Sequence, residues 1–285
     1  MKQQAGTLGA GGGDELYRCS WLPDDEPAAA LAVVHGYGEH GGRYRCLVDA
    51  MVPLGYAVHV FDLRGHGRSP GVRGHIERFA DYLGDAGLFV DAVAAEQPGK
   101  PLYLLGHSLG GLIATAYAEE RPAGLAGLIL SSPFLRLKLP IGGVKLAAAK
   151  VLSRVAPMRD IGNSISADEL SHEPEVVAAY ASDPLNHHVA TARWAAEALA
   201  AQGAALSAAG RLELPLLVMY AGADTIADPA ASRELYAAAS SDDKTLRCYE
   251  GYYHELFNEV GRDAVFADLA AWLDARVVAA GTAAE

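Results

Sequence analysis

Long apolar runs are missing from this chain of 285 residues, although hydrophobic residues make up 51% of it. No run reaches the ~18–20 residues that a helix needs to cross a bilayer, so the sequence indicates no membrane-spanning helix. Cysteine is scarce as well. The three residues Cys19, Cys46 and Cys248 have no metal-ligand spacing, and their odd number argues against a disulfide framework. We therefore expect a reduced, cytoplasmic protein, and nothing in the sequence demands a metal or a cofactor.

Positive charge is in short supply too. The chain has 23 Lys and Arg against 35 Asp and Glu, a net charge of -12. Phosphates repel an acidic surface, which argues against a nucleic-acid partner. The first residues lack the apolar stretch of a secretory signal. Their glycines predict a flexible tail over residues 1–13, followed by one folded domain over residues 14–285.

Short apolar runs alternate with helical stretches along that domain. Strands are predicted at 31–35, 56–62, 101–106, 125–132, 215–222 and 245–251, with helices between them and a last helix over 264–277. Continuous apolar strands alternating with helices predict an α/β fold whose mostly parallel sheet is covered by helices on both faces.

One stretch interrupts the alternation. From about residue 134 to 202 the pattern predicts helical pieces separated by prolines, and no strand. We call residues 134–202 the lid segment. A helical insertion at this point would cover the carboxyl ends of the strands, where loops build the sites of open α/β sheets.

The sharpest motif is GHSLGG at 106–111, which fits G-x-S-x-G. A predicted strand leads into it and a predicted helix leads out. That context supports a functional role for the motif, because a tight strand-to-helix turn lifts the serine hydroxyl above the sheet. An ordinary glycine-rich turn is the alternative. The pattern favours Ser108 as a catalytic nucleophile.

A serine nucleophile needs a base and an acid that orients the base. In a fold with this motif the chain order is serine, acid, histidine. Asp224 follows the predicted strand at 215–222, and we favour it as the acid over Asp228, which could instead cap the next helix. Of ten histidines, only His254 follows Asp224, so His254 is the predicted base.

The oxyanion hole of such a site takes two backbone N–H groups. One belongs to the residue after the nucleophile, here Leu109. The other comes from an early strand-to-helix loop, here His35-Gly36-Tyr37-Gly38, and the Tyr37 amide is the candidate. The glycines of this loop could alternatively serve only to shape the turn.

The same loop also fits a dinucleotide-binding pattern. Residues 36–41 read G-x-G-x-x-G, and Asp62 lies about 20 residues further on, as in an NAD-binding oxidoreductase. That interpretation leaves Ser108, Asp224 and His254 unexplained. The tight turn after Asp62 favours a side chain that fixes the turn instead.

Several segments together resemble the monoacylglycerol lipases, a family in the lysophospholipase-like branch of the α/β-hydrolases. They are HGYGEHGGRY (35–44), FDLRGHGRSPG (61–71), GHSLGG (106–111), LSSPF (130–134) and DKTLRCYEGYYHELFNE (243–259). The resemblance implies an α/β-hydrolase fold with a helical lid. It also implies a triad of Ser108, Asp224 and His254, and an oxyanion hole from the Tyr37 and Leu109 amides.

The resemblance further places Glu39, Arg43 and His107 near the pocket for a glycerol head group. Glu39 and Arg43 could alternatively only pair with each other and brace their loop. Tyr37 stands where smaller residues are common in that family, and its bulk would narrow the pocket. The lid segment resembles the family least.

These observations lead to a serine hydrolase that cleaves a monoacylglycerol, a small lipid ester, to fatty acid and glycerol. A lysophospholipase or a short-chain carboxylesterase would use the same machinery. A non-catalytic binding protein is disfavoured because all three triad positions are filled. A peptidase would want acidic residues in the lid to hold a free amino terminus, and the chain offers Asp168, Glu169, Glu173 and Glu175.

Basic charge is concentrated in the lid segment. Residues 136–159 hold six Lys or Arg and no Asp or Glu, so this stretch carries +6 and the remainder -18. On a helical wheel one face holds Val144, Val151, Leu152 and Val155, and the other side holds Lys145, Lys150 and Arg154. A basic amphipathic helix predicts transient contact with a membrane surface and a peripheral location. A solvated helix whose apolar face caps the pocket is the alternative.

Overall fold

The computed structural model describes residues 1–10, 13–139, 143–162 and 165–282, without the side chains of 143–148 and 278–282. The strands are β1 (Lys2–Gly9), β2 (Glu15–Leu22), β3 (Ala29–Val34), β4 (Tyr56–Phe61), β5 (Leu102–His107), β6 (Gly127–Ser131), β7 (Leu216–Ala221) and β8 (Lys244–Tyr249). The helices are α1 (Arg45–Met51), α2 (Phe79–Glu96), α3 (Leu109–Glu120), α4 (Gly143–Val155), α5 (Pro174–Ser182), α6 (Ala192–Ala208), α7 (Pro229–Ala238) and α8 (Arg262–Thr282). Short 3-10 turns occur at Gly41–Tyr44, Val52–Leu54, Ala167–Glu169, Ala209–Arg211 and Leu256–Asn258.

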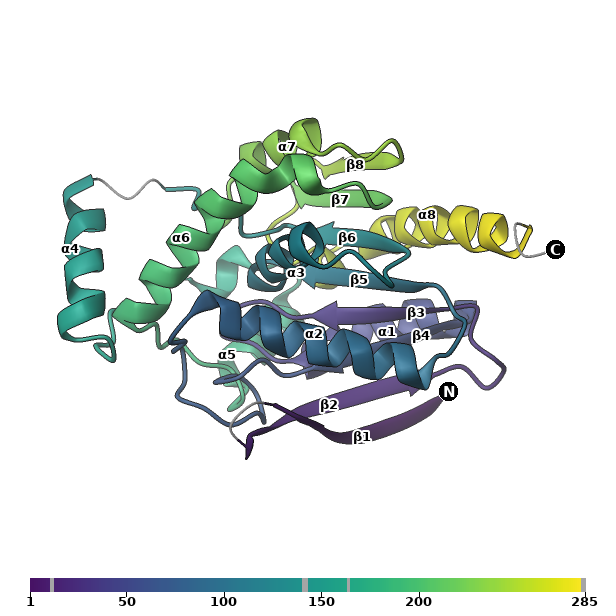
Figure 1. The fold of residues 1–285 in the computed structure, drawn as a ribbon, viewed down its shortest axis with the longest axis horizontal. Coiled ribbons are helices and arrows are strands. Elements are labelled where there is room, and N and C mark those ends of the chain that lie inside the picture. Colours follow the sequence, from purple (N-terminus) through teal and green to yellow (C-terminus); the bar gives the residue numbers. More distant parts are fainter. Residues whose placement is uncertain (11–12, 140–142, 163–164, 283–285) are drawn as a thin grey trace.

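All eight strands join one sheet in the order β1-β2-β4-β3-β5-β6-β7-β8 (Figure 1). Strands β3 to β8 run parallel, and β1 and β2 are antiparallel to their neighbours. Every residue of β3, β4, β5, β6 and β7 is buried, which explains their continuous apolar sequences. The prediction of a mostly parallel sheet is confirmed.

The prediction of a flexible tail over residues 1–13 is wrong for most of its length. Lys2–Gly9 forms β1 and pairs along its whole length with Glu15–Leu22. Only Leu8 of β1 is buried, so the strand is held in place by backbone hydrogen bonds to β2 and not by apolar burial. A strand with exposed side chains leaves no apolar pattern in the sequence, and β2 was not predicted either.

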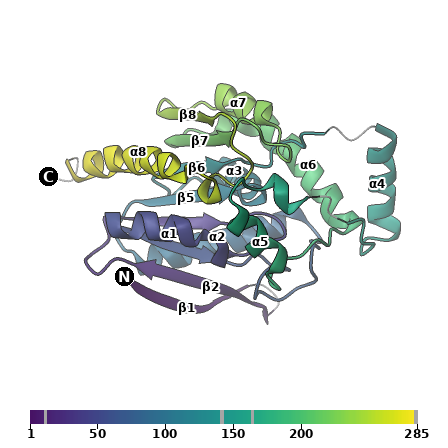
Figure 2. The same ribbon diagram turned by 180° about the vertical axis from the view of Figure 1, so that it is seen from behind.

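Helices cover both faces of the sheet. On one face, α2, α3, α6 and α7 contribute Phe89, Leu112, Ala198 and Leu235 to the larger buried cluster. On the other face, α1 and α8 contribute to the second cluster, for example through Leu47, Leu269 and Leu273. Figures 1 and 2 show these two layers from opposite sides.

The lid segment lies between β6 and β7. Its described residues form α4, the 3-10 turn Ala167–Glu169, α5 and α6, and they add no strand to the sheet. The last helix, α6, runs to Ala208, beyond the predicted limit of 202. Helix α4 stands beside α6 at the end of the molecule furthest from the chain termini (Figure 1). No described helix combines the length and the apolar content that a membrane span requires, and this includes the 21-residue α8.

Candidate active site

The turn between β5 and α3 holds Ser108 in a strained conformation, with φ 51° and ψ -119°. Two glycines make this turn sterically feasible. A Cβ on Gly106 would lie 2.3 Å from the Gly110 carbonyl oxygen, and a Cβ on Gly110 would lie 2.0 Å from the Val34 carbonyl oxygen. The backbones therefore approach too closely for any side chain. This is the geometry that G-x-S-x-G predicts after a strand.

Ser108, His254 and Asp224 form a continuous hydrogen-bonded chain. The Ser108 hydroxyl lies 2.8 Å from His254 Nε2, and His254 Nδ1 lies 2.7 Å from Asp224 Oδ2. All three side chains are buried. The chain consists of a hydroxyl, an imidazole and a carboxylate, brought together from the ends of β5 and β7 and the loop after β8.

Asp224 and Asp228 occupy different places. The second oxygen of Asp224 accepts hydrogen bonds from the Ile226 and Ala227 N–H groups at 2.8 and 2.9 Å, which fixes the carboxylate. Asp228 is the N-cap of α7, where its side chain accepts from Ala230 N–H. The structure thus brings Asp224 to His254 and leaves Asp228 as a helix cap.

Charge around the imidazole raises the pKa of His254. Burial by itself lowers it, but the Asp224 carboxylate, with smaller contributions from Glu255 and Glu39, more than offsets that effect. The pKa of the neighbouring His107 behaves in the opposite way. Burial, reinforced by His254, lowers it to about 4, so His107 is neutral near pH 7.

The loop after β3 is held by buried side chains. Glu39 Oε1 accepts from Gly36 N–H at 2.6 Å and from the Tyr44 hydroxyl at 2.9 Å. His35 Nε2 accepts from Leu63 N–H at 2.9 Å, which ties this loop to the next one. The backbone at Tyr37 is thereby placed beside Ser108, and both residues line one cavity.

The Tyr37 side chain reaches into the lid segment. Its hydroxyl donates a hydrogen bond to the Val189 carbonyl, and its ring lies 3.8 Å from the ring of Trp194 on α6. Tyr37 therefore fills the space between the β3 loop and the lid segment. Leu109 is the first residue of α3, so its N–H belongs to the helix turn that has no intrahelical acceptor.

The Asp62 carboxylate holds the local backbone in place and does not face a ribose-binding site. Its two carboxylate oxygens accept from Gly41 N–H and Arg68 N–H, both at 2.8 Å, and the residue is buried. A Cβ on Gly67, whose φ is +50°, would lie 2.2 Å from Asp62 Oδ2. This use of Asp62 removes the structural basis for the NAD-binding oxidoreductase interpretation.

Glu39 and Arg43 belong to a larger buried network that also contains Glu255. Arg43 Nη1 donates to Glu39 at 2.8 Å and also to Glu255, and Arg43 Nη2 donates to Glu255 at 2.8 Å. Burial opposes the charge on Glu39, but Arg43 and other neighbours lower its pKa to about 2. The two predicted residues do brace their loop, and both also line the cavity at Ser108. Glu255 was not among the predicted site residues, although this residue directly follows His254.

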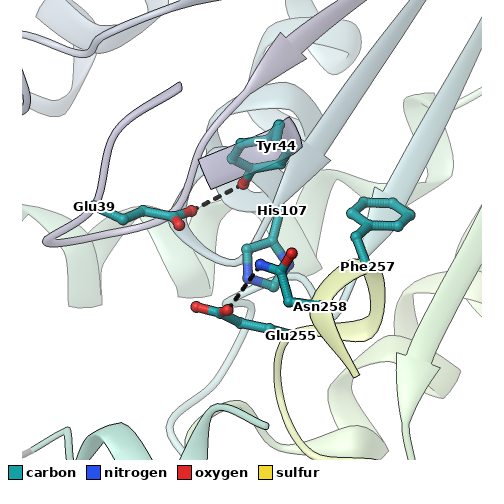
Figure 3. A pocket seen from close by; sticks show the side chains of 6 residues that line it. All are labelled: Glu39, Tyr44, His107, Glu255, Phe257 and Asn258. Carbon is teal, nitrogen blue, oxygen red and sulfur yellow. Dashed lines mark hydrogen bonds between the residues drawn. The ribbon is translucent and has the colours of Figure 1, made fainter. Parts of the chain in front are cut away.

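His107 lines this cavity and also a second, smaller one. Figure 3 shows Tyr44 bonded to Glu39 and Asn258 bonded to Glu255 around the ring of His107. The two cavities have volumes of about 20 and about 10 Å³ and share Glu39, His107 and Glu255. Each has room for about one water molecule, so neither can hold an acyl ester with the side chains as they stand.

Glu259 joins the His254 loop to the lid segment, and it was not among the predicted site residues either. This buried carboxylate accepts from Tyr253 N–H at 3.0 Å and Val260 N–H at 2.9 Å on the loop side. On the lid side it accepts from the Ser171 hydroxyl, from His172 N–H and from the His172 ring. Residues 171–172 are therefore fixed to the loop that carries His254.

The acidic residues considered for a peptidase lie elsewhere. Asp168 and Glu175 are exposed, and Glu169 accepts from the Thr225 hydroxyl. Among the described residues that line the cavity at Ser108, the carboxylates are Glu39 and Glu255.

The sequence profile of a hydrolase family described as serine aminopeptidase, S33 matches residues 25–261. A monoacylglycerol lipase of Mycolicibacterium smegmatis is 37% identical over 92% of this chain and 94% of that protein. Phospholipase YtpA of Bacillus subtilis is 34% identical over 88% of this chain and 96% of that protein.

Solved structures agree with the sequence comparisons. The crystal structure of a Paleococcus ferrophilus monoacylglycerol lipase superposes with a TM-score of 0.84 at 32% identity, covering 92% of this chain and 99% of that one. Sequence, fold and site therefore lead to one assignment. The chain is a lipolytic serine hydrolase and belongs to the monoacylglycerol lipase-like α/β-hydrolases of the S33 family.

Proposed function

We propose that this protein hydrolyses monoacylglycerols to a fatty acid and glycerol. The observation that carries the proposal is a His254 imidazole bonded to Ser108 and Asp224, next to a cavity lined with groups that bind hydroxyls. The similarity to monoacylglycerol lipases supports the same substrate class.

In the proposed mechanism, His254 removes the Ser108 proton as the hydroxyl attacks the ester carbonyl. Asp224 accepts from Nδ1–H, keeps Nε2 free to take that proton, and stabilises the imidazolium. The negative oxygen of the tetrahedral intermediate is bound by the Leu109 and Tyr37 N–H groups, and the N-terminus of α3 adds a favourable dipole.

His254 then protonates the leaving alcohol, which must lie close to Nε2. Glu39, Arg43 and His107 line the adjoining cavities, so a polyol head group placed there would find hydrogen-bond partners. Water takes the place of the alcohol, and His254 activates it to release the fatty acid from Ser108.

Substrate entry requires the lid segment to move. The cavity at Ser108, about 20 Å³, cannot hold an acyl ester, and Leu170 and Tyr180 of the lid segment line it. Glu259 fixes residues 171–172 to the catalytic loop. We propose that opening occurs on the other side, at α4 and at the contact between Tyr37 and α6.

An exposed face of α4 and the turn after it supports membrane contact. Val155 is 74% exposed and Val151 59%, and Met158 and Ile161 are also exposed. Lys150, Arg154 and Arg159 are exposed among them. Val144 and Lys145 belong to the predicted faces, but their side chains lie outside the described residues. We propose that this surface approaches an anionic lipid surface, where monoacylglycerol partitions.

Asp224→Asn should lower kcat by about 10⁴-fold, because an amide disfavours the tautomer in which Nε2 can accept the Ser108 proton. The matched control is Asp228→Asn, which should leave kcat within about twofold because asparagine is itself a good N-cap. Steady-state kinetics of both purified variants test this, and the reverse ranking would exclude Asp224 as the acid.

The pH dependence of kcat/KM should show an acidic limb whose midpoint lies above 6.5, the ordinary pKa of histidine. The base must be neutral to accept a proton, so activity is lost as pH falls through the raised pKa of His254. Initial rates with a soluble short-chain ester from pH 5 to 9 measure the midpoint. A midpoint at or below 6.5 would contradict this electrostatic description.

A panel of mono-, di- and triacylglycerols, lysophosphatidylcholine and aminoacyl amides tests the substrate class. We expect kcat/KM for monoacylglycerol to exceed that for each other substrate by about tenfold or more, because it offers two hydroxyls to a site with hydrogen-bond partners for them, whereas a diacylglycerol or lysophosphatidylcholine offers one and a triacylglycerol none. Ser108→Ala should abolish turnover and fluorophosphonate labelling. Preferred hydrolysis of lysophosphatidylcholine would establish the phospholipase alternative.

Charge reversal at the α4 surface tests membrane contact. Lys150→Glu with Arg154→Glu should weaken co-sedimentation with anionic vesicles and slow hydrolysis of monoacylglycerol in them, since each cation contributes about 1 kcal/mol near such a surface. Hydrolysis of a soluble ester should not change. Lys2→Glu with Arg121→Glu makes the same charge change at exposed positions near the amino ends of the strands. An equal effect of both pairs would assign the loss to overall charge.

A further inference from the structure

The groups around the catalytic cavity carry an excess of negative charge. Glu39, Glu255 and Asp224 are carboxylates, and all three are buried. Among the described residues that line the cavity at Ser108, Arg43 is the one permanent cation. With His107 neutral, and His254 in the neutral form that the proposed mechanism requires, the formal sum at the site is -2.

Arg43 is not available to bind an anionic ligand. Its Nη1 donates to both Glu39 and Glu255, and its Nη2 donates to Glu255. Its guanidinium carbon lies 4.7 Å from the centre of the Tyr180 ring, which covers one face of the group. The side chain is 9% exposed. The cation that a phosphate would need is therefore already neutralised by two carboxylates.

Glu39 and Glu255 line the same cavity as Ser108 and His254. The leaving oxygen must be within reach of His254 Nε2, and Glu255 is the next residue in the chain. The ring of His107 lies 4.9 Å from that of His254 and lines the same cavity as Glu39 and Glu255. A head group that lies in this cavity while attached to the leaving oxygen therefore meets both carboxylates.

We propose that Glu255, together with Glu39, selects against anionic head groups, so that the enzyme accepts esters of neutral polyols and rejects otherwise identical esters that carry a phosphate. Glu255 is the specificity-determining residue in this proposal, which rests on the proposed ester hydrolysis. At an effective dielectric of ~20, one like charge about 6 to 12 Å away changes a binding equilibrium by about 100- to 10-fold. A hydroxyl meets no such repulsion and can donate to either carboxylate.

A matched set of water-soluble esters tests the proposal, each used below its aggregation limit. The set is 1-octanoylglycerol, 1-octanoylglycerol-3-phosphate and octanoylcholine, which are neutral, anionic and cationic in the head group. For the wild type we expect kcat/KM for the neutral ester to exceed that for the phosphate by about 100-fold or more. Desolvation opposes the binding of either charged head group, but the carboxylates repel only the phosphate. The cationic ester should therefore be cleaved at least about tenfold faster than the phosphate ester.

Glu255→Gln removes one carboxylate and retains side-chain hydrogen bonding. It should reduce the neutral-to-phosphate ratio by about tenfold or more, whereas Glu255→Asp, which keeps the charge, should retain it. The matched control is Glu213→Gln, which changes the net charge equally at an exposed position before β7, at the amino end of the sheet. That variant should leave the ratio within about twofold. Fluorophosphonate labelling and thermal melts show whether each variant is folded.

Measurements at two ionic strengths distinguish repulsion by Glu39 and Glu255 from repulsion by the net charge of the whole protein, which is -12. At 0.5 M NaCl the long-range repulsion is screened, whereas the discrimination at the buried site should persist. A wild-type ratio near one, a ratio that collapses in salt, or equal rejection of the cation and the phosphate would each overturn the proposal. So would a folded Glu255→Gln variant with an unchanged ratio. Absence of hydrolysis of all three esters would instead refute the proposed function.

Discussion

The close approach of α3 to β3 is the constraint on which the site depends. Gly110 lies so near the Val34 carbonyl that a Cβ would come within 2.0 Å of its oxygen, and the turn that makes this approach holds Ser108 at an unfavourable φ of 51°. The strain is held by a fully buried sheet on one side and a fully buried helix face on the other. Because the serine cannot relax, its hydroxyl stays directed at an imidazole carried by a loop 146 residues away in the chain.

Electrostatics organises the rest of the site around that hydroxyl. Asp224 favours the protonated imidazole, while burial keeps His107 neutral, so two adjacent histidines have opposite pKa shifts. Glu39 holds the loop of the proposed oxyanion hole and shares Arg43 with Glu255. One buried ion network thus braces the loop, shapes the head-group cavity and gives it its charge. A buried ion pair of this kind is weak evidence for stability but is consistent with specificity.

The lid segment combines a fixed end with an exposed end. Glu259 binds residues 171–172 to the loop that carries His254, whereas α4 packs beside α6 at the far end of the molecule (Figure 2). Apolar and basic side chains are exposed together on and just after α4. A cavity too small for an acyl ester, a bridging Tyr37 and an exposed amphipathic surface are consistent with opening that is coupled to contact with lipid.

The sequence by itself determined the parallel core, the turn at Ser108 and the chain order that singles out His254, because continuous apolar strands and glycine spacing are local signals. It did not reveal β1, whose order comes from backbone pairing and not from side-chain burial. It favoured Asp224 over Asp228, and the structure places Asp224 against His254 and Asp228 at the N-cap of α7. Only the tertiary structure could show that Glu255 shares Arg43 with Glu39. Glu255 and Arg43 lie more than 200 positions apart, so their contact leaves no periodic pattern in the sequence. The charge network forms only when the loops after β3 and β8 meet at the same edge of the sheet.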